Sequence, residues 1–175
     1  AYLAWVSMLN RCYSEKFNRD GSTYKDATVC AEWLIFSNFR KWFIENHVDD
    51  YQLDKDLLYI GNKLYSPHTC IYVPQWLNSF VISAAANRGK YKIGVSWHKH
   101  YKKFSARCRY FKRKEYTDEF IGHFNTEHEA YTAWLMRKLE IASELKSEMD
   151  EIDVRIYPNI VNIVNIIVNI IVISI

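Results

Sequence analysis

The segment from Asn87 to Lys114 constrains this chain most, because it is strongly basic and contains no acidic residue. It holds nearly half of the 23 lysines and arginines in the chain, although the net charge of the whole chain is only +3. Soluble surfaces normally mix both signs of charge, whereas a basic face attracts phosphates and releases their counterions. We therefore expect a nucleic-acid-binding face here, with an ordinary solvated sheet face as the alternative. The basic residues are Arg88, Lys90, Lys92, Lys99, Lys102, Lys103, Arg107, Arg109, Lys112, Arg113 and Lys114.

The pattern of this region predicts a small sheet packed on one helix. Alternation of polar and apolar residues is typical of strands. The expected strands are Ile93–His98, Phe104–Phe111 and Phe120–Phe124, with a polar connection over 112–119. Thr126 and Glu129 have the spacing of a capping box, which predicts that a helix begins there and runs over 126–148. We expect a three-stranded antiparallel sheet with a helix behind it over residues 91–146.

The residues before this sheet predict helices and short strands. Apolar spacing over 2–13 and 28–46 is typical of amphipathic helices, and we interpret the aromatic face of the second as core. Two β-like runs, Leu57–Ile60 and Lys63–Tyr65, flank a Gly-Asn pair, and a helical stretch begins after Pro74. Small and polar residues then indicate a linker. The expected organisation is an α+β chain with a first domain over 1–82, a linker over 83–90 and a second domain over 91–146.

The C-terminal segment, 156–175, consists of Ile and Val interrupted by four asparagines. The uncharged run after Pro158 is short for a membrane span, so we do not expect this protein to bind a membrane. A helix would place Asn162, Asn165 and Asn169 on one face, yet β-branched residues favour strand and aggregation. We interpret the segment as a low-complexity extension without a function of its own.

The cysteines indicate a reducing compartment. Cys12, Cys30, Cys70 and Cys108 are scattered and include no close pair of the kind that a structural zinc site needs. Their spacing is not that of a disulfide framework either, so we expect free thiols. No secretory signal is visible, and the chain begins at Ala1 inside a helix-like pattern, as a fragment or a processed chain would. We expect a cytoplasmic location in a bacterial host cell, or association with the nucleoid.

Four motifs in the basic region carry a resemblance to a known family. They are Gly94-Val95-Ser96-Trp97, Lys103-Phe104-Ser105-Ala106-Arg107, Ile121-Gly122-His123-Phe124-Asn125-Thr126-Glu127-His128-Glu129-Ala130 and Ala133-Trp134. In order and spacing they resemble the APETALA-two (ethylene-response-factor) DNA-binding domain. The resemblance implies a sheet that enters the major groove, with arginines on guanine and lysines on phosphates. The expected DNA-binding residues are Arg88, Lys92, Trp97, Lys99, Lys102, Lys103, Arg107, Arg109, Lys112 and Arg113.

A second resemblance lies in the first domain. The stretches Leu53–Leu58, Gly61–Pro67, Thr69-Cys70 and Val73-Pro74, together with Trp5–Tyr13 upstream, are similar to phage His-Asn-His homing endonucleases. The resemblance implies a ββα-like His-Me-finger-type module with magnesium or manganese on Asp54 and Asn78, and no small-molecule cofactor. Asn62 would be the central asparagine. Lys55 stands where the family has its general-base histidine, and His68 is the nearby substitute.

Together these observations predict a double-stranded DNA-binding protein. The leading hypothesis is a phage-type mobile-element endonuclease, or a degenerate relative, that cuts phosphodiester bonds with a divalent metal. The alternative is a non-catalytic DNA-binding transcriptional regulator, which Lys55 favours because a protonated lysine is a poor base. Asp54 and Asp56 are then a solvated turn pair. A third reading is RNA or membrane binding through the basic face. The oligomeric state is not predicted.

Overall fold

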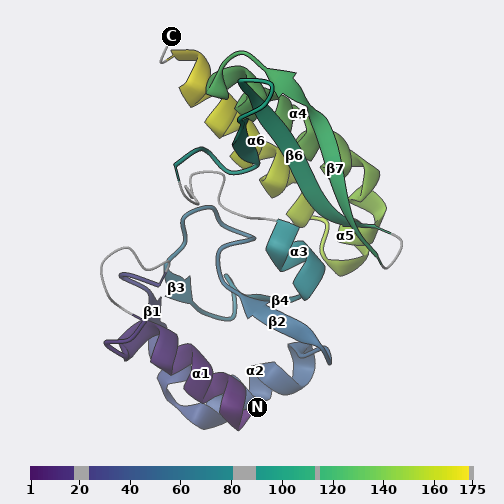
Figure 1. The fold of residues 1–175 in the computed structure, drawn as a ribbon. Helices are drawn as coiled ribbons and strands as arrows, with labels where there is room; N and C mark the ends of the chain where they lie inside the picture. Colours follow the sequence, from purple (N-terminus) through teal and green to yellow (C-terminus); the bar gives the residue numbers. More distant parts are fainter. Residues whose placement is uncertain (18–23, 81–89, 113–114, 174–175) are drawn as a thin grey trace. The chain divides into compact units, whose positions relative to one another are not determined.

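The computed structural model divides the chain into two compact units, Ala1–Gln75 and Trp76–Ile175 (Figure 1). It describes residues 1–17, 24–80, 90–112 and 115–173. The expected linker, 83–90, lies outside these residues except for Lys90. The predicted α+β class is confirmed, since helices accompany small sheets along the chain and a three-stranded antiparallel sheet packs on a helix in the second unit.

The first unit builds two small sheets between helices. Its elements are α1 (Tyr2–Tyr13), β1 (Thr28–Val29), the 3₁₀ helix η1 (Ala31–Leu34), α2 (Phe36–Asn46), β2 (Tyr51–Asp54), β3 (Leu64–Tyr65) and β4 (Ile71–Pro74). Strand β1 pairs in parallel with β3, and β2 pairs antiparallel with β4. The prediction of one helix over 28–46 was wrong in its first third, because Thr28 and Cys30 donate their backbone N–H groups to the chain around β3.

The aromatic face expected in the core is buried at its centre, whereas Leu34 at its start is exposed. Trp33 and Phe39 are fully buried, and their rings meet edge to face with centroids 5.1 Å apart. The indole N–H of Trp5, on α1, donates to the backbone carbonyl of Trp33 at 2.7 Å. The edge-to-face arrangement is favourable for aromatic pairs. The hydrogen bond from Trp5 connects α1 to the segment before α2. The run Leu57–Ile60 forms turns rather than the expected strand.

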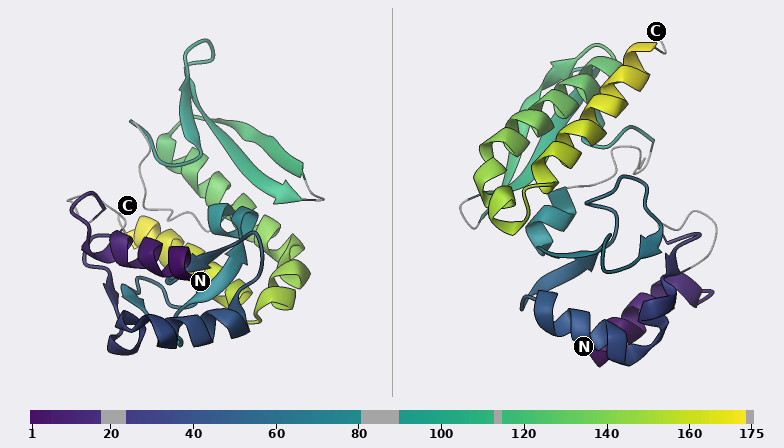
Figure 2. Two further views of the ribbon diagram at one scale, coloured as in Figure 1. Left: turned by 90° about the horizontal axis from the view of Figure 1, so that it is seen from below. Right: turned by 180° about the vertical axis from the view of Figure 1, so that it is seen from behind.

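The second unit is a sheet backed by helices. After α3 (Gln75–Phe80), which begins at the boundary, its elements are β5 (Val95–His98), β6 (Lys103–Lys112), β7 (Glu115–Phe124), α4 (Glu127–Glu144), α5 (Lys146–Ile152) and α6 (Ile156–Ile173). The strands are antiparallel in the order β5-β6-β7. Helix α4 packs on one face of the sheet, and α6 lies beside α4 (Figure 2).

Two local devices position the sheet against α4. The capping box is confirmed: the Thr126 hydroxyl accepts the backbone N–H of Glu129, whose carboxylate accepts the backbone N–H of Thr126. Gly94 has φ +77°, and a Cβ atom there would lie 2.2 Å from the Trp134 ring. The close approach of chain and helix therefore requires glycine at this position.

Several elements of the second unit differ in extent or type from the predictions. The helix expected over 126–148 ends at Glu144, where α5 follows after one residue. Strand β7 begins five residues before the expected start at Phe120, and a bulge lies beside Ala106 and Arg107. The C-terminal segment is helical because Ile156, Ile160 and Val164 recur every fourth residue and are buried. No helix among the described residues has the length and hydropathy of a membrane span.

Candidate nucleic-acid interface and the Asp54 loop

The sheet of the second unit has a face opposite α4, which we call the outer face. Along β6, Ala106 and Cys108 are fully buried, whereas Arg107 and Arg109 are exposed. Successive side chains of a strand point to opposite faces, so both arginines belong to the outer face. Ser105, the polar residue before them, is instead buried, because its hydroxyl forms a 2.9 Å hydrogen bond with Nδ1 of His123 on β7.

Each outer-face arginine lies near an aromatic ring of β7. The guanidinium carbon of Arg109 is 4.7 Å from the centroid of the Tyr116 ring, and that of Arg107 is 6.0 Å from the Phe120 ring. Tyr116 and Phe120 remain 49% and 48% exposed. Such contacts between a cation and a ring are favourable and hold a long side chain in one region of space. The arginines are thus positioned on the surface while they stay accessible.

One acid also lies on the outer face. The Nε–H group of Arg107 donates to Oδ1 of Asp118 at 3.1 Å, and both side chains are more than half exposed. Sequence reasoning missed Asp118 because it placed the residue in a connection between strands. The long β7 places Asp118 opposite Arg109 in the register. The exposed residues before Phe120 carry no alternation that could have found it.

The remaining predicted DNA-binding residues take different positions. Lys99 and Lys102 are exposed in the turn between β5 and β6, and Lys103 is exposed at the start of β6. Trp97 lies opposite Phe104 in the pairing of β5 with β6. Paired residues share a face of the sheet, and the alternation along β6 puts Phe104 on the face that packs against α4. The structure therefore gathers lysines at one end of the outer face and leaves Trp97 off that face.

Lys92 does not reach the outer face either. Its backbone N–H donates to the Glu127 carboxylate at 2.7 Å, and its ammonium group lies 4.8 Å from the centroid of the Tyr131 ring on α4. Lys112 ends β6, and only its backbone is described. Arg88 and Arg113 lie outside the described residues.

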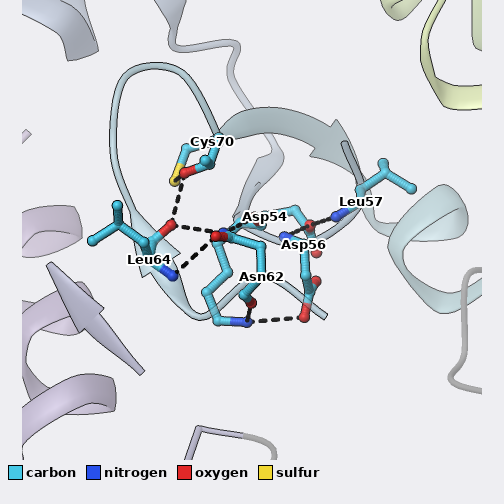
Figure 3. Close-up of polar contacts among 8 residues, drawn as sticks. Asp54, Asp56, Leu57, Asn62, Leu64 and Cys70 are labelled. Atoms are coloured by element: carbon cyan, nitrogen blue, oxygen red, sulfur yellow. Dashed lines mark hydrogen bonds and ion pairs between the residues drawn. The ribbon is translucent and has the colours of Figure 1, made fainter. Parts of the chain in front are cut away.

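The first unit holds the candidate catalytic residues in a loop of residues 54–64, here the Asp54 loop (Figure 3). Oδ1 of Asp54 accepts the backbone N–H groups of Asp56 and Leu57 at 2.9 and 2.7 Å. This carboxylate therefore stabilises the turn that follows β2. Burial, together with the nearby charge of Asp56, raises the pKa of Asp54 to about 6.

Lys55 and Asn62 close the same loop. Lys55 is buried, and its ammonium group donates to Oδ2 of Asp56 at 2.9 Å and to the backbone carbonyl of Asn62 at 3.1 Å. The Asn62 amide donates to the carbonyls of Lys55 and Leu64, and its oxygen accepts the Leu64 N–H. The polar groups of these two residues are thus used to hold the loop together.

The other candidate catalytic residues lie elsewhere. His68 is exposed in the turn between β3 and β4, and it forms no hydrogen bond or ion pair with the residues that the structure describes. Asn78 lies on α3 in the second unit, so its pairing with Asp54 stays a prediction.

These residues fit a divalent metal poorly. Across the described residues, no group of three or more histidine, cysteine or acidic side chains is arranged to hold a metal ion. The ammonium group of Lys55 is bound to Asp56, one of the two carboxylates of the loop. Its charge would repel a second cation at the same oxygens.

Comparisons of this chain with protein-family models, with curated proteins and with solved structures give no match. What the chain does must therefore be inferred from its own residues and their geometry.

Proposed function

We propose that this protein binds double-stranded DNA through the outer face of the β5–β6–β7 sheet. The observation that carries the proposal is the pair of exposed guanidinium groups, Arg107 and Arg109, on the face opposite α4. A sheet can enter the major groove, where an arginine donates two hydrogen bonds to O6 and N7 of guanine. The lysines of the adjoining turn, Lys99 and Lys102, supply phosphate contacts.

Two further observations support this proposal. The motifs between Gly94 and Trp134 resemble the APETALA-two domain, in which the same face of the sheet contacts DNA. The rings of Tyr116 and Phe120 hold the arginines on the surface, which lowers the entropy that they lose on binding. DNA binding would place the protein in the cytoplasm of a bacterial host, at the nucleoid.

For the first unit, we propose a non-cleaving relative of the His-Asn-His nucleases. Lys55 and Asn62 serve the loop itself, and the Lys55 charge opposes a divalent metal at Asp56, the carboxylate to which it is bound. A metal-dependent nuclease is the second candidate. It is favoured by the closeness of two carboxylates, since the charge of Asp56 adds to burial in raising the pKa of Asp54. Magnesium or manganese would then bind at Asp54.

Binding of a labelled duplex, followed by fluorescence anisotropy, tests the main proposal. The double variant Arg107→Ala/Arg109→Ala should bind at least about 10-fold more weakly, since one arginine–guanine contact is worth about 1–3 kcal/mol. Arg40→Ala/Lys41→Ala removes two exposed charges from α2 and should bind as the wild type does. Equal losses in both double variants would reduce the effect to net charge and overturn the proposal.

Nicking of supercoiled DNA, in magnesium or manganese against EDTA, tests the second candidate. We expect no metal-dependent nicks. Asp54→Asn is the informative variant, because an amide oxygen can still accept the two backbone N–H groups that Asp54 binds. Nicks that need the metal and vanish in Asp54→Asn would establish a nuclease and overturn the non-cleaving assignment.

A further inference from the structure

Groove reading by the arginines accounts for the place of Tyr116 and Phe120 beside them, but it leaves the exposed surface of both rings without a use. In duplex DNA the major groove presents the edges of bases, while the flat faces of the bases are stacked on one another. A half-exposed aromatic ring offers a flat apolar surface, and several on one face mark an interaction site. Such rings match a ligand whose bases are unstacked.

The two rings repeat one arrangement. Tyr116 and Phe120 are four residues apart on the same side of β7, or about 13 Å along the strand. Arg109 accompanies the first ring and Arg107 the second. Each unit of the repeat therefore combines a half-exposed aromatic ring with a cation that lies over it. A nucleotide combines the complementary groups, a flat base and a phosphate.

The row of rings continues at both ends. The Phe120 ring is 4.9 Å from His123, centroid to centroid, and the His123 ring is 4.8 Å from the exposed Tyr101. At the other end, Phe111 lies 5.0 Å from Tyr116. The turn that carries Tyr101 also carries two exposed lysines, Lys99 and Lys102, so the row of rings leads to a basic end of the sheet.

We propose that the outer face also binds single-stranded DNA, with unpaired bases stacked on Tyr116 and Phe120 and the phosphates beside Arg107 and Arg109. Stacking of bases on aromatic side chains above a positively charged surface is the general mode of binding single strands. The proposal shares the outer face with duplex binding, but it requires the rings as well as the charges. It does not depend on a sequence, because every base has a flat face.

The test is anisotropy of the full chain with a labelled oligothymidylate and with a labelled duplex at the same salt concentration. Tyr116→Leu and Phe120→Leu keep an apolar side chain and remove the ring. Each should weaken oligothymidylate binding about 10-fold and change duplex binding less than about 3-fold. Tyr116→Phe keeps the ring and should bind as the wild type does. Tyr59→Leu, at a tyrosine that is likewise 49% exposed but lies in the first unit, is the matched control.

The outcomes separate this proposal from duplex binding. A wild-type protein that binds the duplex but not oligothymidylate overturns the single-strand proposal alone, whereas the reverse overturns duplex binding alone. Ring variants that bind oligothymidylate as the wild type does, or that lose both ligands equally, contradict stacking. Tighter binding of oligouridylate than of oligothymidylate would contradict the assignment to DNA.

Discussion

Two basic residues, Lys55 in the Asp54 loop and Arg109 on the outer face, show opposite uses of a positive charge. Lys55 is buried and already bound to a carboxylate and a carbonyl. Arg109 is exposed, lies near a ring, and forms no ion pair with the residues that the structure describes. The first charge is satisfied within the fold, and the second is available to a phosphate or a base. Burial and partners, rather than the count of basic residues, therefore separate structural from binding cations.

Gly94→Ala should have the largest effect on stability. The new Cβ atom would meet Trp134 at 2.2 Å on a backbone with φ +77°. We expect a loss of about 3 kcal/mol in the unfolding free energy of the second unit, with DNA binding lost alongside. Urea unfolding followed by tryptophan fluorescence measures it.

Gly61→Ala in the Asp54 loop is the matched control, since its φ is +74° but no atom lies within 4 Å of the added Cβ. It should lose only about 1 kcal/mol. Equal losses in the two variants would show that the contact between Gly94 and α4 is not tight.

Asn62→Ala should have the next largest effect on stability. The variant loses two donated hydrogen bonds and one accepted bond within the Asp54 loop. We expect a loss of about 2 kcal/mol in the unfolding free energy of the first unit, and duplex affinity within about 2-fold of the wild type. Asn10→Ala, on the exposed side of α1, should change stability by less than about 0.5 kcal/mol. A large fall in duplex affinity would contradict a purely structural role for the loop.

The pH dependence of stability tests the burial of Asp54. Its pKa is about 6 in the folded protein, above the value of about 3.9 for an unfolded chain. The folded state therefore holds the proton more tightly, so this group contributes stability below pH 4 that is lost as the pH rises towards 6 and beyond. Asp54→Asn should remove this contribution.

The comparison is the unfolding free energy of Asp54→Asn minus that of the wild type. It should grow by about 2 kcal/mol between pH 4 and pH 7. A difference that stays constant over this range would show that the carboxylate is not destabilised by its surroundings.

Asp118→Asn should have the smallest effect. It removes the charge with which Arg107 forms an ion pair, so duplex DNA should bind about 2- to 3-fold more tightly at low salt. Stability should change by less than about 0.5 kcal/mol, because the ion pair is exposed. Glu45→Gln, an exposed acid on α2, is the control for net charge. Weaker binding in Asp118→Asn would mean that the acid positions Arg107 rather than competes for it.

Much of the second unit could be predicted because its signals are local. The alternation along β6 is made by neighbouring residues of the sequence. The capping box at Thr126 is likewise made by residues only three positions apart. The first half of β7 could not be predicted in this way, since Glu115, Tyr116, Thr117 and Asp118 are all exposed and lack an apolar alternation. Their strand conformation comes from pairing with β6. The partner of Arg107 was missed for the same reason.

The first unit shows where longer-range contacts override local patterns. Thr28 and Val29 continue an apparent helical pattern, yet they pair with β3 more than thirty residues later. Lys55 lies between two aspartates, a pattern typical of a solvated turn, but it is buried because the Asn62 carbonyl accepts its ammonium group. In the tail, packing of Ile156 and Ile160 in the core overrides the strand preference of β-branched residues.

The most direct test of the central claim is a titration of the isotope-labelled chain with duplex DNA, followed by the backbone amide resonances. The amides of β6 and β7 around Arg107, Arg109 and Tyr116 should shift, whereas those of the Asp54 loop should not. Shifts confined to the Asp54 loop, with the outer face unchanged, would contradict the claim that the exposed arginines of the sheet bind DNA.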